Sequence, residues 1–249
     1  MQITLVINAQ QKLVLPVQYN HILQGFIYNA ISPELAAFLH EKGYEYGNRR
    51  FKLFAFSRLI GNYQLEPEKD RIIFSDLVKL VISSPVDEFC QSLANGILFG
   101  KYLRLGDNRV EIERIEVERQ QVESQKITVK TLSPVVVYST MFRPDGRKYT
   151  CYFQPGEPDY AKLVEHNLRK KYLAFAGQEA PPGEVCVRSM GQTKLHVLRY
   201  KDTVIKGYSG KLELTGPKEL LQMAVDAGIG SKNSQGFGCV VITKNTKSS

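Results

Sequence analysis

A glycine-rich stretch near the C-terminus combines residue types that could bind an anion. It reads Gly228-Ile229-Gly230-Ser231-Lys232-Asn233-Ser234-Gln235-Gly236-Phe237-Gly238, with two Gly-hydrophobic-Gly clamps around five polar residues. Glycine permits positive φ and lets another backbone approach closely. The polar centre can present backbone N–H groups, hydroxyls, amides and one ammonium group to an anion. We therefore expect this stretch, the glycine loop (228–238), to contact phosphate.

The elements around the glycine loop differ from those of familiar phosphate-binding motifs. Residues 217–227 are predicted to form a short helix and residues 239–243 a buried strand, so the loop joins a helix to a strand. A dinucleotide fingerprint runs from strand to helix, and a Walker loop needs a lysine after its last glycine, which Gly236 lacks. The structural alternative for this loop is a long turn that closes a sheet.

The charge of the chain favours a polyanionic partner. The 249 residues carry a formal net charge of +8, and the isoelectric point is about 9.2. Between Cys186 and Ser249, ten Lys and Arg residues stand against four Asp and Glu residues, so this quarter carries +6 of the total. Positive charge concentrated around an anion-competent loop favours nucleic acid over a merely solvated surface. No apolar run approaches membrane-spanning length, so we expect no membrane partner.

The cysteines and carboxylates do not form a recognisable metal site. Cys90, Cys151, Cys186 and Cys239 are far apart, form no C-x-x-C pair and do not adjoin a histidine. We expect reduced thiols in a cytoplasmic protein, because the N-terminus alternates like a strand and lacks the basic region of a signal peptide. The Asp and Glu residues are scattered and offer no acidic pair for a two-metal nuclease.

Four motifs in the N-terminal third add a resemblance to a known family. They are Tyr19-Asn20-His21, the run from Leu23 to Ile31, Leu39-His40-Glu41 and the run from Lys52 to Ser57. Together with the glycine loop, their order and spacing resemble the Cas6 family of CRISPR repeat-RNA-processing endoribonucleases, within the repeat-associated (RAMP) superfamily. The resemblance covers both ends of the chain, whereas the middle agrees only in the succession of elements. It implies a precursor CRISPR RNA repeat as partner, no metal and no cofactor.

The resemblance also implies a catalytic set of Tyr28, His40 and Lys52. Metal-free RNA cleavage needs a base for the ribose 2′-hydroxyl, an acid for the leaving 5′-oxygen and a donor for the charge of the phosphorane. His40 lies off the apolar stripe of its helix, and an imidazole can give or take a proton at physiological pH, so it would be the acid or base. Tyr28 would hydrogen-bond the 2′-hydroxyl or assist as a base. Lys52, or Arg49 and Arg50 in its place, would stabilise the phosphorane.

Each of the three catalytic candidates also has a non-catalytic interpretation. His40 could instead be a surface histidine at a helix C-terminus, where the helix dipole stabilises it. Tyr28 fits a half-buried helical tyrosine, and Lys52 a lysine with its head in water. The other histidines, His21, His166 and His196, are interpreted as structural or surface residues.

The predicted RNA contacts share either positive charge or a place in the glycine loop. They are Gly228, Gly230, Ser231, Lys232, Asn233, Ser234, Gln235, Gly236 and Gly238 of the loop, Arg49 and Arg50, the group Arg143, Arg147 and Lys148, and the hairpin group Lys194, Arg199, Lys201 and Lys206. Any one of these charges could simply be solvated. Clustered beside an anion-competent loop, they favour contact with phosphates.

The elements that must position these residues follow one order twice. In the first round we expect strands at 2–8, 51–56, 71–74, 77–83 and 109–119, a helix capped by Asn20, a second ending at Gly43, a polar loop at 44–50 and a helix from Pro85 with Leu98 inward. Alternation slips by one residue between Ile112 and Ile115, which predicts a β-bulge. In the second round we expect strands within 126–138 and at 184–188, 194–198, 208–214 and 239–243, and helices at 159–176 and 217–227. This is an α+β fold of two tandem ferredoxin-like (βαββαβ) domains, residues 1–123 and 124–249.

Two other functions stay open. The same fold and loop could hold repeat RNA as a non-catalytic subunit of a CRISPR effector complex. An unrelated phosphate-handling enzyme is the third reading, although no nucleotide motif supports it. The sequence leaves open the repeat recognised, the cut position, and whether the chain forms a homodimer or joins other CRISPR effector subunits.

Overall fold

The computed structural model describes residues 1–9, 12–100, 103–200 and 203–243. The first half contains β1 (Gln2–Ala9), β2 (Leu13–Pro16), α1 (Asn20–Ala30), α2 (Pro33–Glu41), β3 (Tyr44–Tyr46), β4 (Arg49–Phe51), β5 (Ala55–Phe56), β6 (Tyr63–Glu66), the 3₁₀ turn η1 (Pro67–Lys69), β7 (Arg71–Phe74), β8 (Val78–Ser83), α3 (Asp87–Phe99), β9 (Leu103–Leu105) and β10 (Asn108–Glu118). The second half contains β11 (Lys126–Thr131), β12 (Tyr138–Phe142), β13 (Lys148–Tyr152), α4 (Pro158–Ala176), β14 (Cys186–Ser189), β15 (Lys194–Tyr200), β16 (Thr203–Ser209), β17 (Lys211–Thr215), α5 (Lys218–Ala227), the 3₁₀ turn η2 (Asn233–Gln235) and β18 (Val240–Ile242). The predicted tail at 244–249 lies outside the described residues.

The two main sheets have the same antiparallel topology. One has the strand order β5-β8-β1-β10-β9 and the other β14-β17-β11-β18. In each, the first and third strands of the repeating unit pair at the centre, β1 with β8 and β11 with β17. The second and fourth strands flank them, which is the ferredoxin-like arrangement that the sequence predicts.

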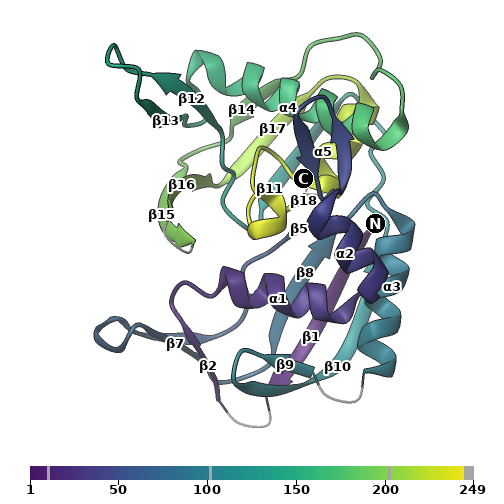
Figure 1. The fold of residues 1–249 in the computed structure, drawn as a ribbon, viewed down its shortest axis with the longest axis vertical. Coiled ribbons are helices and arrows are strands. Elements are labelled where there is room, and N and C mark those ends of the chain that lie inside the picture. The colour runs from purple at the N-terminus through teal and green to yellow at the C-terminus, as the bar shows by residue number, and fades with distance from the viewer. Residues whose placement is uncertain (10–11, 101–102, 201–202, 244–249) are drawn as a thin grey trace, which may run out of the picture.

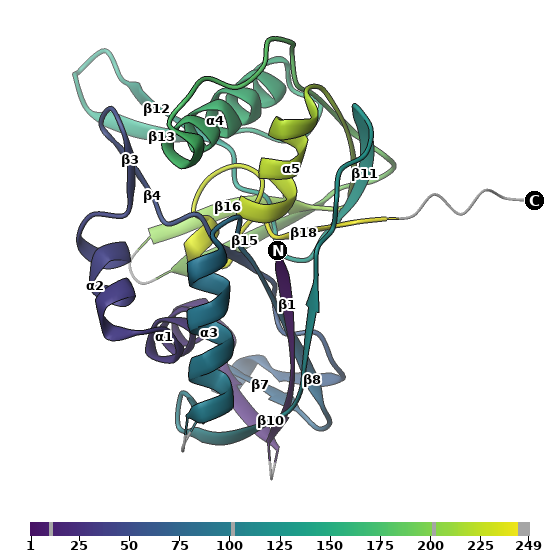
Figure 2. The same cartoon turned by 90° about the vertical axis from the view of Figure 1, so that its right-hand side faces the viewer.

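The first sheet carries its helices on one face, as Figure 2 shows for α1, α2 and α3. The inward residues of β1, such as Leu5 and Ile7, pack with the apolar stripe of α1, including Leu23 and Ile27. Leu98 of α3 was predicted to point inward, but it is 66% exposed, because Ile97 already occupies the inward position of the last turn.

The predicted β-bulge is confirmed at the pairing of β1 with β10. Val6 pairs with Arg114 and Ile7 with Ile112, so Glu113 is the extra residue. The slip in the alternation therefore has a backbone cause, since two residues of β10 oppose a single position of β1 there.

Three predictions about the extent of strands and loops were wrong. The polar loop at 44–50 is a two-stranded hairpin, β3 paired with β4. The strand expected at 51–56 is interrupted, since Leu53 adopts a positive φ of 52° between β4 and β5. The strand expected at 208–214 is divided between β16, which pairs with β15, and β17, which joins the second sheet.

A second apolar cluster joins the second sheet to α4 and α5. It contains Val129, Leu168 and Leu221, and it includes Leu53 from the first half of the chain. The glycine loop, drawn in yellow, follows α5 and lies between the two sheets in Figure 1. No helix within the described residues is long and apolar enough to cross a membrane.

Candidate functional site

The glycine loop has the backbone that its sequence predicts. Gly228, Gly230, Gly236 and Gly238 have φ values of 81°, 71°, 86° and 70°. A Cβ atom at Gly230 would collide with the carbonyl of Val136, and one at Gly238 with the carbonyl of Ile229. These positions require glycine both for conformation and for close approach of neighbouring backbone.

The side chain of Asn233 holds the loop together from inside. Its Nδ2 donates to the carbonyl oxygens of Ile229 and Phe237, each at 3.1 Å, and its Oδ1 accepts from Lys171 Nζ at 2.7 Å. The residue is only 9% exposed. The polar atoms of the Asn233 side chain are therefore already paired within the protein, and its predicted contact with RNA stays a prediction.

Lys171 of α4 fastens the loop to the second half of the chain. Its Nζ donates to the carbonyl oxygens of Gly228 at 2.6 Å and Gly230 at 3.0 Å, as well as to Asn233. Burial lowers the pKa of Lys171 to about 7, while the surrounding oxygen acceptors stabilise its ammonium form. This arrangement makes Lys171 a positioning residue for the loop.

The first half of the chain holds the loop through α1. Asn20 Nδ2 donates to the carbonyl oxygens of Gln235 at 3.0 Å and Gly236 at 3.3 Å, and Gln24 Nε2 donates to that of Ser234 at 2.6 Å. Asn20 was predicted to cap α1, but the N-cap position belongs to Tyr19 and has no side-chain cap. The Asn20 side chain is instead used in a contact more than 200 residues away in sequence.

Several backbone N–H groups of the loop are used inside the protein. The backbone N–H groups that donate to carbonyl oxygens within the protein are those of Ile229, Ser231, Gln235, Gly236 and Gly238. The expected backbone cradle for an anion is thus occupied at these five positions of the loop. What remains at the surface are the partly exposed side chains of Ser231, Lys232, Ser234 and Gln235.

The structure brings His40 and Lys52 together. His40 is exposed in the last turn of α2, and Lys52 Nζ donates to its carbonyl oxygen at 3.2 Å. Lys52 is partly buried, and burial followed by the nearby charge of Arg50 lowers the pKa of its ammonium group. Among the described residues, no hydrogen bond links the side chains of Tyr28, His40 and Lys52 to one another.

Tyr28 approaches the same region from α1. Its ring packs against Phe54 with centroids 5.9 Å apart, and Phe54 lies two residues after Lys52. Burial, with a smaller effect from Tyr200, raises the pKa of the Tyr28 phenol to about 12. At neutral pH the phenol therefore keeps its proton and can donate a hydrogen bond, which disfavours the predicted role as a base.

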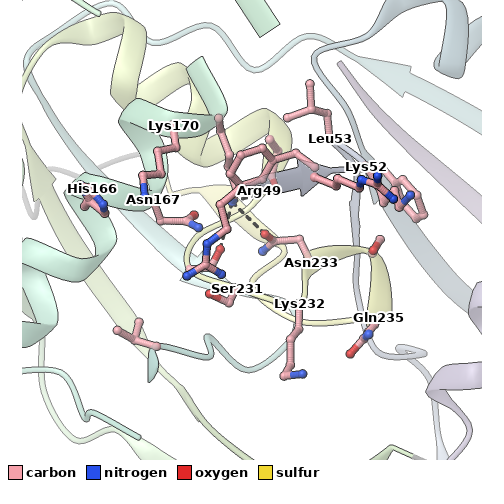
Figure 3. A pocket seen from close by; sticks show the side chains of 18 of the residues that line it. Arg49, Lys52, Leu53, His166, Asn167, Lys170, Ser231, Lys232, Asn233 and Gln235 are labelled. Carbon is pink, nitrogen blue, oxygen red and sulfur yellow. Dashed lines mark hydrogen bonds between the residues drawn. The ribbon is translucent and has the colours of Figure 1, made fainter. Parts of the chain in front are cut away.

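A pocket of about 380 Å³ lies beside this region (Figure 3). It is walled by the β4 segment with Arg49, Arg50 and Lys52, by α4 with His166, Asn167 and Lys170, and by the glycine loop from Gly230 to Gln235. Among the described residues, no cluster of three or more His, Cys, Asp or Glu side chains that could hold a metal ion is found.

The predicted basic groups lie on two hairpins. Lys194, Arg199 and Lys206 belong to the β15–β16 hairpin, whose Leu198 and Ile205 pack with Phe237 of the glycine loop. Lys201 lies outside the described residues. Arg143, Arg147 and Lys148 belong to the β12–β13 hairpin, where Arg147 already pairs with Asp145 at 2.6 Å.

Two family models match almost the whole chain. The one described as "CRISPR-associated protein Cas6, N-terminal" matches residues 14–116, and "CRISPR associated protein Cas6, C-terminal" matches residues 116–242. The chain belongs to the Cas6 family.

Individual Cas6 relatives agree over most of their length. "CRISPR-associated endoribonuclease Cas6" of Pyrococcus furiosus is 32% identical over 243 residues, which are 92% of this chain and 84% of that protein. "CRISPR-associated endoribonuclease Cas6 1" of Methanocaldococcus jannaschii is 26% identical over 245 residues, 97% of this chain and 92% of that protein. A solved structure titled "Characterization of a Cas6-related gene from Pyrococcus furiosus" is 25% identical, with a TM-score of 0.84 over 98% of this chain and 99% of that one.

The sequence analysis did not identify the α4 side of the pocket. Lys171 follows Val164 and Leu168 at helical spacing, so it occupies the inward stripe of an amphipathic helix. A lysine in such a stripe needs buried oxygen acceptors. The position of Lys171 in the apolar stripe was therefore the sequence signal that could have revealed its buried role. His166, interpreted as a structural or surface residue, lines the pocket together with Asn167 and Lys170.

Proposed function

We propose that this Cas6-family protein cuts the repeat of a precursor CRISPR RNA through attack of a ribose 2′-hydroxyl on the adjacent phosphate. Both curated relatives above are named endoribonucleases, and this activity accompanies membership of the family. The contact between Lys52 Nζ and His40 O carries the proposal. It brings an ammonium group to the helical turn that bears an exposed imidazole, at the edge of a basic pocket.

In this reaction the 2′-oxygen forms a bond to phosphorus while the bond from phosphorus to the 5′-oxygen breaks. His40 performs proton transfer, because imidazole both accepts and donates protons near neutral pH. Tyr28, whose phenol stays protonated, donates a hydrogen bond, and Lys52 stabilises the negative charge of the phosphorane. The products are a 2′,3′-cyclic phosphate upstream and a 5′-hydroxyl downstream.

The RNA is proposed to lie along the surface that joins the pocket to the two hairpins. Lys232, Arg49 and Arg50 line the pocket together with Lys52. The net charge of +8 supports such a path, because contacts with phosphates dominate affinity for nucleic acids.

The test incubates the protein, His40→Ala and His21→Ala with RNA of the repeat from its own locus, in the presence of EDTA. His21 is a matched control, because it is an exposed histidine on α1 outside the pocket. We expect the wild type and His21→Ala to give one cut per repeat with a cyclic phosphate end. We expect His40→Ala to bind the RNA and lose cleavage by roughly 100-fold or more, the usual contribution of general acid–base catalysis.

The outcome that contradicts catalysis is tight repeat binding with no cut by any of the three proteins. That result would assign the chain to a non-catalytic RNA-binding subunit instead. Equal cleavage by the wild type and His40→Ala would keep the nuclease and remove His40 from its mechanism.

A further inference from the structure

The end of the β15–β16 hairpin is bound to the first half of the chain. In Figure 1 the hairpin extends beside the glycine loop toward α1. Tyr200, the last residue of β15, donates a hydrogen bond from its hydroxyl to Gln24 Oε1 of α1. The preceding residue, Arg199, donates its backbone N–H to Gln18 Oε1 at 3.1 Å. Two successive residues of β15 therefore contact side chains that lie more than 170 residues earlier in the sequence.

The side-chain amide of Gln24 is held by both of its polar atoms. Its Oε1 accepts from the Tyr200 hydroxyl, and its Nε2 donates to the carbonyl oxygen of Ser234 at 2.6 Å. A backbone carbonyl can only accept, so the amide must turn its NH₂ group toward the glycine loop and its oxygen toward Tyr200. One partly buried amide thus joins the hairpin, α1 and the glycine loop.

The proposed catalytic residue Tyr28 lies beside this pair. It follows Gln24 by four residues on α1, and residues at that spacing are neighbours on one face of a helix. Burial, followed by Tyr200, raises the pKa of the Tyr28 phenol, so the two phenols are close enough to interact. The Tyr28 ring also packs against Phe54, with centroids 5.9 Å apart. The phenol is therefore bordered by Phe54 and by the Tyr200–Gln24 pair.

The hydrogen bond between Tyr200 and Gln24 limits the motion of the groups around Tyr28. A free glutamine side chain has several rotatable bonds, and fixing them costs conformational entropy that a hydrogen bond at each polar atom can offset. A catalytic donor must be held in the productive geometry, because a misplacement of about 1 Å can cost roughly 100-fold in rate. Supporting hydrogen bonds of this kind hold such donors in place.

We propose that Tyr200 and Gln24 are positioning residues that hold the Tyr28 phenol in the orientation needed for cleavage. They act through Tyr28 and do not touch the reacting phosphate or the 2′-hydroxyl. The same hairpin carries Arg199 and Lys206, two of the predicted RNA contacts. An RNA bound by the hairpin is thereby aligned with Tyr28 through the hydrogen bond of Tyr200. This inference rests on the proposed function.

The first test compares Tyr200→Phe with the wild type on RNA of the repeat. The variant keeps the ring and loses only the hydroxyl. We expect its single-turnover cleavage rate at saturating RNA to fall about five- to tenfold, the effect of one hydrogen bond, while the Kd for RNA stays unchanged. Tyr152→Phe is the matched control and should cleave like the wild type, because its hydroxyl donates to Val204 of the same hairpin at 3.0 Å, within the second half.

A double-mutant cycle separates positioning of Tyr28 from a general structural role. If Tyr200 acts through the Tyr28 phenol, Tyr200→Phe should cause no further loss of rate in a Tyr28→Phe background. Equal losses in both backgrounds would overturn the proposal, since Tyr200 would then act independently of Tyr28. A Tyr28→Phe variant that cleaves as fast as the wild type would overturn it as well.

Gln24→Met tests the second member of the pair. Methionine has a similar length but neither donates to Ser234 nor accepts from Tyr200, so the rate should fall at least as far as in Tyr200→Phe. Adding Tyr200→Phe to Gln24→Met should then cause no further loss, because the hydrogen bond is already absent. If Gln24→Met does not fold, judged by its thermal transition, the cycle of Tyr200 with Tyr28 still decides the question.

The remaining outcomes distinguish this inference from the proposed function. A wild type that cuts the repeat, with an equal rate in Tyr200→Phe, would reject the inference and keep the nuclease. A higher Kd for RNA in Tyr200→Phe with an unchanged rate at saturation would make Tyr200 an RNA contact instead of a positioning residue. A wild type that cuts no repeat RNA would reject the proposed function, and this inference with it.

Discussion

Lys171 is a buried side chain that holds the glycine loop from α4. In Lys171→Met the carbonyl oxygens of Gly228 and Gly230 and the amide of Asn233 lose their shared donor inside the protein. We expect the free energy of unfolding to fall by roughly 3 kcal/mol, because buried acceptors are left unpaired. Urea denaturation of Lys171→Met beside the exposed-site control Lys162→Met checks this. Equal stability of the two variants would contradict the anchoring role.

The pH dependence of cleavage should identify Lys52. Lysine must be charged to stabilise the phosphorane, and burial and Arg50 lower the pKa of Lys52 from its ordinary 10.5. The rate should therefore decline with rising pH, and should begin to do so at a lower pH than an ordinary lysine would produce. Tyr28, with a phenol pKa of about 12, titrates too high to cause that decline.

The measurement is the single-turnover rate between pH 7 and pH 10. In Lys52→Arg the decline should move out of this range, because guanidinium keeps its proton there. An unchanged alkaline decline in Lys52→Arg would show that another group causes it.

Individual residues also show what the sequence could and could not predict. The requirement for glycine at 228, 230, 236 and 238 was predictable, because only glycine suits positive φ with close backbone contacts. The inward role of Asn233 was not, since its partner Lys171 lies 62 residues away. Side-chain direction within a polar loop depends on such distant partners, and a single sequence does not display them.

Among the elements, the β12–β13 hairpin is the most exposed basic candidate. Arg143 lies over the Tyr149 ring and Lys148 over the Phe142 ring, whereas Arg147 is engaged by Asp145. We expect Arg143→Gln to weaken RNA binding at all sequences and to reduce the slope of log affinity against log salt by roughly one. Arg147→Gln should have a smaller effect, because part of its charge is already neutralised. Binding at several salt concentrations checks this, and identical slopes for wild type and Arg143→Gln would remove the hairpin from the RNA path.

Elements were predictable where burial sets a strict pattern. The bulge in β10 was visible because Ile112 and Ile115 break an otherwise regular alternation against β1. The β3–β4 hairpin was not visible, because its strands are three residues each and nearly all exposed. Short polar strands leave no hydrophobic period, so their pairing is decided by the structure around them.

At the scale of the whole molecule, the glycine loop is held from both halves of the chain. Asn20 and Gln24 bind it from α1, and Lys171 binds it from α4. The order of elements allowed two ferredoxin-like units to be predicted, and both sheets have that topology. The division at residue 123 stays a prediction. The polar contacts between the halves could not be predicted, because they are made by individual side chains rather than by a periodic pattern.

These contacts lead us to expect that the two halves unfold together. Ser133, only 2% exposed, donates from Oγ to the carbonyl of Phe56 at 2.9 Å and accepts from the Cys239 N–H at 3.0 Å, so one hydroxyl bridges both sheets. Ser133→Ala should lower the free energy of unfolding by about 2 kcal/mol, since it leaves a buried donor and a buried acceptor unpaired.

The half-exposed Ser139 of β12 provides the matched control, Ser139→Ala, which should change stability by less than about 0.5 kcal/mol. Calorimetry and circular dichroism of the wild type should give one coincident transition, the behaviour of a single cooperative unit. Two separate transitions, one of them unaffected by Ser133→Ala, would show that the sheets are stable independently. The loop would then be a tether between two domains, and RNA binding would have to order them. A single transition means that the site between the sheets is assembled before RNA arrives.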